Sequence, residues 1–283
     1  MSEYSNSYAK FLNEADIRSL LLPDDSLIVI KDNMFNDRLY KCNKGLQIND
    51  ELYFIKWSFW NSLECYTEHI ASTFIRECGY SAQQTMMVIY QNTPAVLCKD
   101  FTNEFGLLKI FEFNSDYWIY EYSLEELRNY FERLKNCDVE DCVTKFWEMC
   151  LFDYLLDNRD RHCGNVGFCI KNDEHIFSPL FDNARTLDFD IFEYHKYNRN
   201  LKMMEPQRMI YGCGLIHSWF EYRHKKERPS EVINKFQELD VVAAMDRSTI
   251  GFKEEWRSYF RTLIYYRHKC LIKNDEFVWE GMK

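Results

Sequence analysis

Short apolar runs separated by turn residues occupy the first hundred positions. Residues 27–30 form one such run, and residues 39–42 are predicted to pair with it as a hairpin. Turn-forming residues follow at 43–45 and 49–50. The next run, 52–57, is aromatic and β-branched, which predicts a buried strand. This part of the chain is therefore predicted to be mainly β-structured.

A helix and a second hairpin follow. Apolar residues recur at helical spacing from about residue 62 to 77, and Gly79 ends the pattern. Residues 86–90 and 95–98 are predicted to form a hairpin around a turn at 92–94. Strands, one helix and then two more strands are the order expected of a small α+β lobe.

The pattern becomes helical after residue 122. Ser123 and Glu126 have capping-box spacing, and Asp138 supplies an acceptor at the start of a second helix. That helix runs to about residue 156 and is apolar on nearly every side, which is typical of a helix buried inside a domain. It leads into a polar loop at 157–164.

Two short strands, 166–170 and 175–178, are predicted after this loop, and the tail from 230 to 273 is again helical. We therefore predict an α+β fold with two lobes that meet near residues 99–104. The smaller lobe would comprise residues 1–100 and the larger would comprise residues 101–283.

Composition narrows the class of protein. Hydrophobic residues make up 46% of the chain and aromatic residues 17%, enough for a sizeable core without disulfides. The net charge of −10 disfavours extended binding to nucleic acid, because an acidic surface repels phosphates. The chain has 11 cysteines, no signal-like start and no apolar run that could span a bilayer. A cytoplasmic location with free thiols is expected, without a membrane partner, and secretion as an effector remains an alternative.

Two polar stretches hold the residue types that phosphoryl transfer requires. Transfer needs a carboxylate that accepts or orients the attacking hydroxyl, oxygen ligands for magnesium, and a cation beside the triphosphate. Asp160 and Asn165 lie on the loop after the apolar helix and would provide the base and one metal ligand. Asp182, on a turn after the strands, would provide a second metal ligand, because magnesium prefers hard oxygen donors.

The cation would be Lys56, at the end of the predicted buried strand. A lysine in so apolar a run needs a carboxylate partner, because an unpaired buried charge is costly. Glu64 and Glu68 lie four residues apart, and therefore on one face of the next helix. We take Glu64 as the first choice for this partner and keep Glu68 as the alternative.

The order of these residues resembles a known family. The strings DRHxxN at 160–165 and FDN at 181–183 resemble the catalytic loop and metal turn of HipA-like serine/threonine kinases. The resemblance extends over about residues 52–187 and is to a short form of the family, without a long amino-terminal subdomain. Because this family is related in fold to protein and phosphoinositide kinases, the resemblance implies a bilobal protein-kinase-like fold, with a small, mainly β lobe and a larger helical lobe.

The resemblance also implies a role for each candidate residue. Asp160 would be the catalytic base, Asn165 and Asp182 would hold magnesium, and Lys56 with Glu64 would bind the ATP phosphates. The adenine would hydrogen-bond to backbone groups of the segment between the lobes, Cys98, Lys99, Asp100 and Phe101. ATP and Mg²⁺ are thus the expected cofactors. The expected acceptor is a Ser or Thr hydroxyl, on an unidentified protein or on the chain itself, where Ser5, Ser7 and Tyr8 lie in a polar start.

The chain departs from the family pattern in two ways. No glycine lies between Asp32 and Arg38, so a glycine-rich phosphate loop is missing before Lys56. Backbone amides, or Asn33, Asn36 and Arg38, would cover the phosphates instead. HipA itself carries an extra amino-terminal segment that contacts its DNA-binding antitoxin. This chain is shorter than that arrangement requires, so a HipB-like antitoxin is not expected as a partner.

Three alternative functions stay open. The DRHxxN string also occurs in phosphoinositide kinases, which would be expected to show a basic or apolar surface, and the one basic cluster here is 223–228. A small-molecule kinase would be expected to carry His-Gly-Asp before its asparagine, which this chain lacks. A pseudokinase would bind nucleotide without turnover. The presence of Lys56, Asp160, Asn165 and Asp182 argues against such decay.

Overall fold

The computed structural model describes residues 28–31, 35–40, 43–48, 50–57, 63–111, 123–158, 160–187 and 230–273. Asn33, the hydroxyls of Ser5, Ser7 and Tyr8, and the basic cluster 223–228 lie outside these residues, as do the side chains of Asn36 and Arg38. None of the described helices is long and apolar enough to cross a bilayer.

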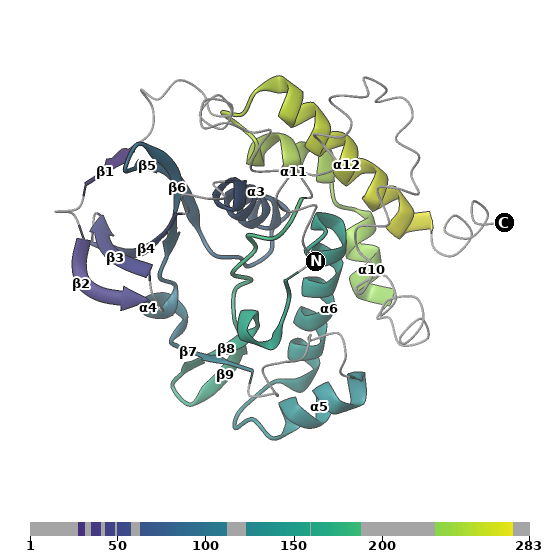
Figure 1. Ribbon diagram of the computed structural model, residues 1–283. Coiled ribbons are helices and arrows are strands. Elements are labelled where there is room, and N and C mark those ends of the chain that lie inside the picture. The colour runs from purple at the N-terminus through teal and green to yellow at the C-terminus, as the bar shows by residue number, and fades with distance from the viewer. Residues whose placement is uncertain are drawn as a thin grey trace, which may run out of the picture.

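A six-stranded sheet forms one side of the molecule (Figure 1). Its strands, in the spatial order β1-β5-β6-β4-β3-β2, are β1 (Ile28–Ile30), β5 (Thr85–Tyr90), β6 (Thr93–Lys99), β4 (Glu51–Lys56), β3 (Asn43–Ile48) and β2 (Phe35–Tyr40). Every neighbouring pair is antiparallel except β1 and β5. The strand predicted at 52–57 is β4, and it lies in the interior of the sheet.

The predicted hairpin between 27–30 and 39–42 is wrong. β1 pairs in parallel with β5, and β2 pairs with β3, so β1 and β2 lie at opposite edges of the sheet. The segment predicted as turn residues, 43–45, is instead the start of β3, which is hydrogen-bonded on both sides. Gly45 and Leu46 are buried there, and pairing with two neighbours outweighs the turn preference of the local sequence.

The hairpin of β5 and β6 and the helix before it are confirmed. Tyr90 pairs with Thr93, and Gln91 and Asn92 form a tight turn with positive φ, of 50° and 59°. The turn comes slightly earlier than predicted, because Pro94 already pairs within the ladder. The helix is α3 (Leu63–Glu77), which lies between the sheet and the other helices (Figure 1).

The second part of the described chain is mainly helical and carries a three-stranded antiparallel sheet, β7-β8-β9. Its elements are α4 (Thr102–Phe105), β7 (Leu107–Ile110), α5 (Leu124–Glu132), α6 (Val139–Leu156), the 3₁₀ turn η4 (Cys163–Asn165), β8 (Gly167–Lys171), β9 (Glu174–Phe177), α10 (Ser230–Gln237), α11 (Val241–Ser248) and α12 (Glu254–Lys273). The molecule is therefore α+β, as the sequence predicted.

Both predicted helix caps are confirmed. The Ser123 side chain accepts from the Glu126 backbone amide and the Glu126 carboxylate accepts from the Ser123 amide, a complete capping box at α5. Asp138 caps α6 by accepting from the amide of Asp141. A cap of this kind contributes about 1 kcal/mol to the stability of a helix.

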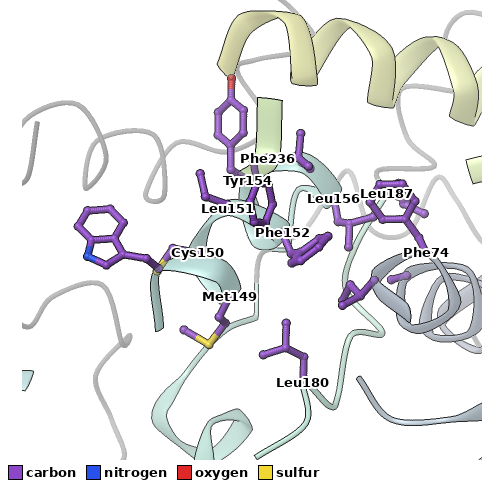
Figure 2. Packing of buried hydrophobic residues seen from close by; sticks show 14 of the residues in the cluster. Phe74, Met149, Cys150, Leu151, Phe152, Tyr154, Leu156, Leu180, Leu187 and Phe236 are labelled. Carbon is purple, nitrogen blue, oxygen red and sulfur yellow. The ribbon is translucent and has the colours of Figure 1, made fainter. Parts of the chain in front are cut away.

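The core is built around α6, whose residues from Phe146 to Leu156 are all buried. The ring of Phe152 lies 6.2 Å from that of Phe74 on α3 and 4.8 Å from that of Phe236 on α10 (Figure 2). Burying one such ring contributes roughly 1.5–3 kcal/mol. This packing holds the carboxyl end of α6, and thus the start of the loop with Asp160, in a fixed position relative to α3.

Candidate active site

The ammonium of Lys56 joins two carboxylates from different parts of the chain. Its Nζ lies 2.6 Å from Glu68 Oε2 on α3 and 2.7 Å from Asp182 Oδ1 on the turn after β9. The Glu68 side chain is fully buried, whereas that of Asp182 is 42% exposed. Burial lowers the pKa of Lys56, but Glu68 and Asp182 outweigh it and raise this pKa above its ordinary value.

The predicted pairing of Lys56 with Glu64 is wrong, and the alternative, Glu68, is correct. Both carboxylates lie on one face of α3, one turn apart, but only Glu68 lies in the buried interface with β4. Glu64 is closer to the surface, and its Oε1 lies 3.7 Å from Nε of Arg185.

Glu68 is also fixed from the side of the turn that carries Asp182, the predicted metal turn. Its second oxygen, Oε1, accepts a hydrogen bond of 3.0 Å from the backbone amide of Asn183. The Asn183 side chain donates to Ser72 Oγ at 3.1 Å, one turn further along α3. The hydroxyl of Thr67 donates to the carbonyl of Ala184. Residues 182–184 are thus fastened to α3 by three polar contacts.

Arg161 binds the loop of Asp160 to the turn of Asp182. It is fully buried, and its Nε and Nη2 donate to the two carboxylate oxygens of Asp153, each at 2.9 Å. Nη2 also donates to Asn183 Oδ1 at 2.7 Å. Nη1 donates to the backbone carbonyls of Asn165 and Phe181, each at 2.9 Å. All five N–H groups of the guanidinium are therefore used, which fixes two functional segments against each other.

The loop that carries Asp160 is braced by its own side chains. The Asn158 side chain donates to Asp153 at 2.8 Å and accepts from the backbone amide of Asp160 at 3.0 Å. The Asn165 amide donates to the backbone carbonyl of Asp160 at 2.9 Å. His162 Nδ1 accepts from the backbone amide of Gly164, which braces the loop further. The Asp160 carboxylate itself is 32% exposed and lies at the surface of the site.

The donor set on these segments fits a magnesium ion. Asp182 sits at φ +56°, on a turn that directs its carboxylate to Lys56. Since the Nδ2 of Asn165 is used by Asp160, its Oδ1 is the atom that could bind a metal. Among the described residues no group of three His, Cys, Asp or Glu could hold a metal by itself. Magnesium needs no such group, because it is usually held by one or two carboxylates together with substrate phosphates.

Cys98 belongs to the face of the sheet that carries Lys56. Cys98 pairs with Phe54 of β4. Because successive side chains of a strand point to opposite faces of the sheet, Phe54, Lys56 and Cys98 share one face, the face towards α3. Cys98 is fully buried, and burial raises the pKa of its thiol well above its ordinary value. It therefore contributes a neutral, apolar side chain to the floor of the site.

The backbone of the predicted adenine-binding segment already has partners. The Lys99 amide donates to the Gln84 carbonyl at 2.8 Å, and the Asp100 amide donates to the Leu52 carbonyl at 2.8 Å. The Lys99 carbonyl accepts from the Gln83 side chain at 3.0 Å. The Lys99 side chain pairs with Glu51. The end of β6 is therefore held firmly by the segments on both sides of it.

Asp100 and Phe101 shape the turn after β6. The Asp100 carboxylate accepts from the amide and the hydroxyl of Thr102, at 2.9 and 2.5 Å, and so starts α4. The Phe101 ring lies 6.0 Å from that of Phe181, the residue before Asp182. The predicted nucleotide segment and the metal turn therefore share a small apolar cluster.

This fold and the arrangement of Lys56, Asp160 and Asp182 belong to a known family of proteins. Residues 34–249 match the HipA-like C-terminal domain family, and the chain belongs to that family. It is similar to the serine/threonine-protein kinase CtkA of Helicobacter pylori strain J99, with 31% identity over 156 residues. These residues cover 49% of this chain and 47% of the relative, so the match spans about half the length of that curated protein. The family predicted from 160–165 and 181–183 is confirmed.

The fold is shared with solved structures. One is the H. pylori proinflammatory kinase CtkA, with a TM-score of 0.61 and 18% identity, which covers 87% of this chain and 98% of that chain. Another is HipA of Shewanella oneidensis MR-1, solved with HipB and operator DNA, with a TM-score of 0.51 and 13% identity. It covers 79% of this chain and 61% of that chain.

Sequence reasoning missed three residues of this site. Asp153 has no signal of its own in an apolar helix beyond being a carboxylate among apolar neighbours. Asn183 stands out in the sequence only as part of the FDN string. Arg185 carries no motif, and its spacing of three residues from Asp182 is the signal that could have found it.

Proposed function

We propose that this protein is an ATP- and magnesium-dependent kinase that phosphorylates Ser or Thr hydroxyls of proteins. The observation that carries the proposal is the contact of Lys56 with Glu68 and Asp182. An ammonium that is held by one buried carboxylate, and that reaches a second, partly exposed one beside a polar loop, suits the binding of phosphates with magnesium.

Each residue has a distinct task in this proposal. Lys56, oriented by Glu68, binds phosphate oxygens of ATP. Asp182 and Asn165 hold Mg²⁺. When the ion is bound, it neutralises part of the phosphate charge. The Asp160 carboxylate is partly exposed, so that an acceptor hydroxyl can reach it, and it accepts the hydroxyl proton. Arg161 does not touch substrate, and instead keeps the two segments in register.

The protein would work as two lobes, residues 1–100 and 101–283. The six-stranded sheet with α3 would form the smaller lobe, and α5 to α12 the larger. The adenine would lie at residues 98–101. Because the backbone amides of Lys99 and Asp100 already have protein partners, the Lys99 carbonyl, which has a second lone pair, is the group that would accept from the adenine amino group.

A protein acceptor is favoured over a lipid or a small molecule. The similar curated protein is named a serine/threonine-protein kinase, and the proposal extends that activity to this chain. We further propose that the kinase phosphorylates itself. The antitoxin and operator DNA of the solved HipA complex belong to that protein, and the net charge of −10 gives no reason to expect DNA here.

Two measurements test the proposal. In thermal unfolding, the melting temperature should rise when ATP and Mg²⁺ are both present, and should not rise when either is added alone. Incubation with radiolabelled ATP should then label the protein or a generic protein acceptor on Ser or Thr. Stabilisation without label would point to a pseudokinase, and label on phosphoinositides alone would point to the lipid-kinase alternative. Neither stabilisation nor label would contradict the proposal.

A further inference from the structure

We propose that Arg185 is a further catalytic residue, which binds the phosphoryl group while it passes from ATP to the acceptor. The inference rests on the proposed kinase function. It starts from the position of the guanidinium, whose Nε lies 3.9 Å from Asp160 Oδ2 and 3.7 Å from Glu64 Oε1. Arg185 therefore lies beside the proposed base, on the side of the site that is open to solvent.

The contacts of Arg185 are weak enough to be exchanged for a phosphate. Both distances are longer than a hydrogen bond, and the side chain is 64% exposed. Exposed ion pairs of this kind contribute about 0–1 kcal/mol, so leaving Glu64 and Asp160 requires little free energy. A guanidinium also presents paired N–H donors that match the oxygens of a phosphate.

The backbone under Arg185 is fixed, although its side chain is exposed. The carbonyl before it, on Ala184, accepts from Thr67 of α3. The residue after it, Thr186, is buried and donates to the Asn183 carbonyl at 2.9 Å. The amide of Leu187 donates to Leu156 at 2.7 Å. The side chain thus reaches out from a rigid segment three residues beyond Asp182, as a preorganised phosphate ligand requires.

Among the described residues, the two other arginine and lysine side chains of the site, Arg161 and Lys56, already have tasks in the proposed function, Arg161 in joining the two segments and Lys56 in binding phosphates of ATP. Arg161 uses all five donors inside the protein, and Lys56 is held by two carboxylates. The region before Lys56 also lacks the glycine-rich stretch that covers phosphates in protein kinases. Arg185, beside the proposed base, is the further donor for the charge that develops on the transferred group.

The step proposed for Arg185 is an in-line displacement. The acceptor oxygen forms a bond to the γ-phosphorus while the bond from that phosphorus to the β–γ bridging oxygen breaks, and ADP leaves with the electron pair. The hydroxyl proton passes to Asp160. Arg185 donates hydrogen bonds to the non-bridging oxygens of the transferring group and remains protonated throughout. In other phosphoryl-transfer enzymes an arginine in this role is worth about 10³–10⁵ in kcat.

Kinetics of Arg185→Met and Arg185→Lys test the inference, with Arg133→Met as a control. Arg133 is also exposed but ends α5, where it donates to the Asn129 carbonyl. We expect Arg185→Met to lower kcat about 100-fold or more, with the KM for ATP changed less than about threefold, because the contact forms in the transition state. Arg185→Lys should recover only part of kcat, and the control should match the wild type.

A binding measurement separates this role from a structural one. Mg·ADP with aluminium fluoride mimics the transferring phosphoryl group, and it should raise the melting temperature of the wild type more than a non-hydrolysable ATP analogue does. Arg185→Met should lose this difference but keep the shift caused by the analogue. A kcat within about threefold of the wild type, or an unchanged response to aluminium fluoride, would overturn the inference while leaving the kinase proposal intact. A wild type without any transfer would instead contradict the proposed function.

Discussion

Lys56 Nζ and Glu68 Oε2 lie 2.6 Å apart, and this contact joins the six-stranded sheet to α3. The second oxygen of Glu68 accepts from the Asn183 amide, so one buried carboxylate fixes both the lysine and the metal turn. In this chain the lysine, the helix and the turn are therefore linked through hydrogen bonds between buried groups rather than through surface charge.

This linkage predicts different effects for substitutions of Glu64 and Glu68 on α3. Glu68→Gln removes the charge that Lys56 faces and should lower the catalytic efficiency with ATP about 100-fold, because an interaction with a charged partner is lost at the phosphate site. Glu64→Gln weakens the long, exposed contact with Arg185 and should have an effect below about tenfold. Steady-state kinetics of both variants checks this. A larger loss for Glu64→Gln would contradict the assignment.

Arg161 should matter for stability as well as activity. Arg161→Met leaves the Asp153 carboxylate buried without its bidentate partner, which should destabilise the protein by about 3–5 kcal/mol. Urea denaturation measures this change. Arg128→Met is the matched control, because its pair with Glu140 is exposed and should contribute only about 0–1 kcal/mol. Equal effects of the two substitutions would show that the buried network is not a main source of stability.

We predict that the folded protein loses stability in mild acid because His69 becomes protonated. It lies on α3, with its Nδ1 3.0 Å from Thr85 Oγ1, and burial lowers its pKa from 6.5 to about 4. The folded state therefore favours neutral His69, and this stabilisation is complete above pH 6.5 and is lost as the pH falls towards 4. The free energy of unfolding should fall by about 2–3 kcal/mol across this range. His69→Gln should remove that part of the slope, and an unchanged slope would contradict the prediction.

Local signals in the sequence were sufficient for much of the fold. The caps at Ser123 and Asp138 and the hairpin after Tyr90 depend on residues within a few positions of each other, and they were predicted correctly. The partner of β1 was not predicted correctly. In the chain, β2, β3, β4 and α3 lie between β1 and β5, the strand with which β1 pairs. Nothing close to residues 28–30 in sequence determines which edge of the sheet they join.

The same distinction applies to the site. Asp160, Asn165 and Asp182 stand in recognisable strings and Lys56 ends an apolar strand, so a role could be predicted for each before its position was known. Helical periodicity could not choose between Glu64 and Glu68, which share a face, because only the depth of packing against β4 separates them.

The missed residues Asp153 and Asn183 have a partner on another segment: Arg161 lies 8 residues after Asp153 and 22 residues before Asn183. Asp153 and Asn183 both bind Arg161, and each contact forms only when α6, the loop and the metal turn have come together. Buried networks of this kind leave no periodic or local trace in a single sequence.

The most direct test of the account separates nucleotide binding from transfer at Asp160. Isothermal titration of wild type and Asp160→Asn with MgATP, beside radiolabel transfer by the same preparations, measures both steps. We predict that Asp160→Asn binds MgATP with an affinity within about threefold of the wild type but transfers no detectable label, because a base acts on the acceptor rather than on ATP. Transfer by Asp160→Asn at the rate of the wild type, or loss of binding and transfer together in a folded protein, would contradict the role of Asp160 as the base.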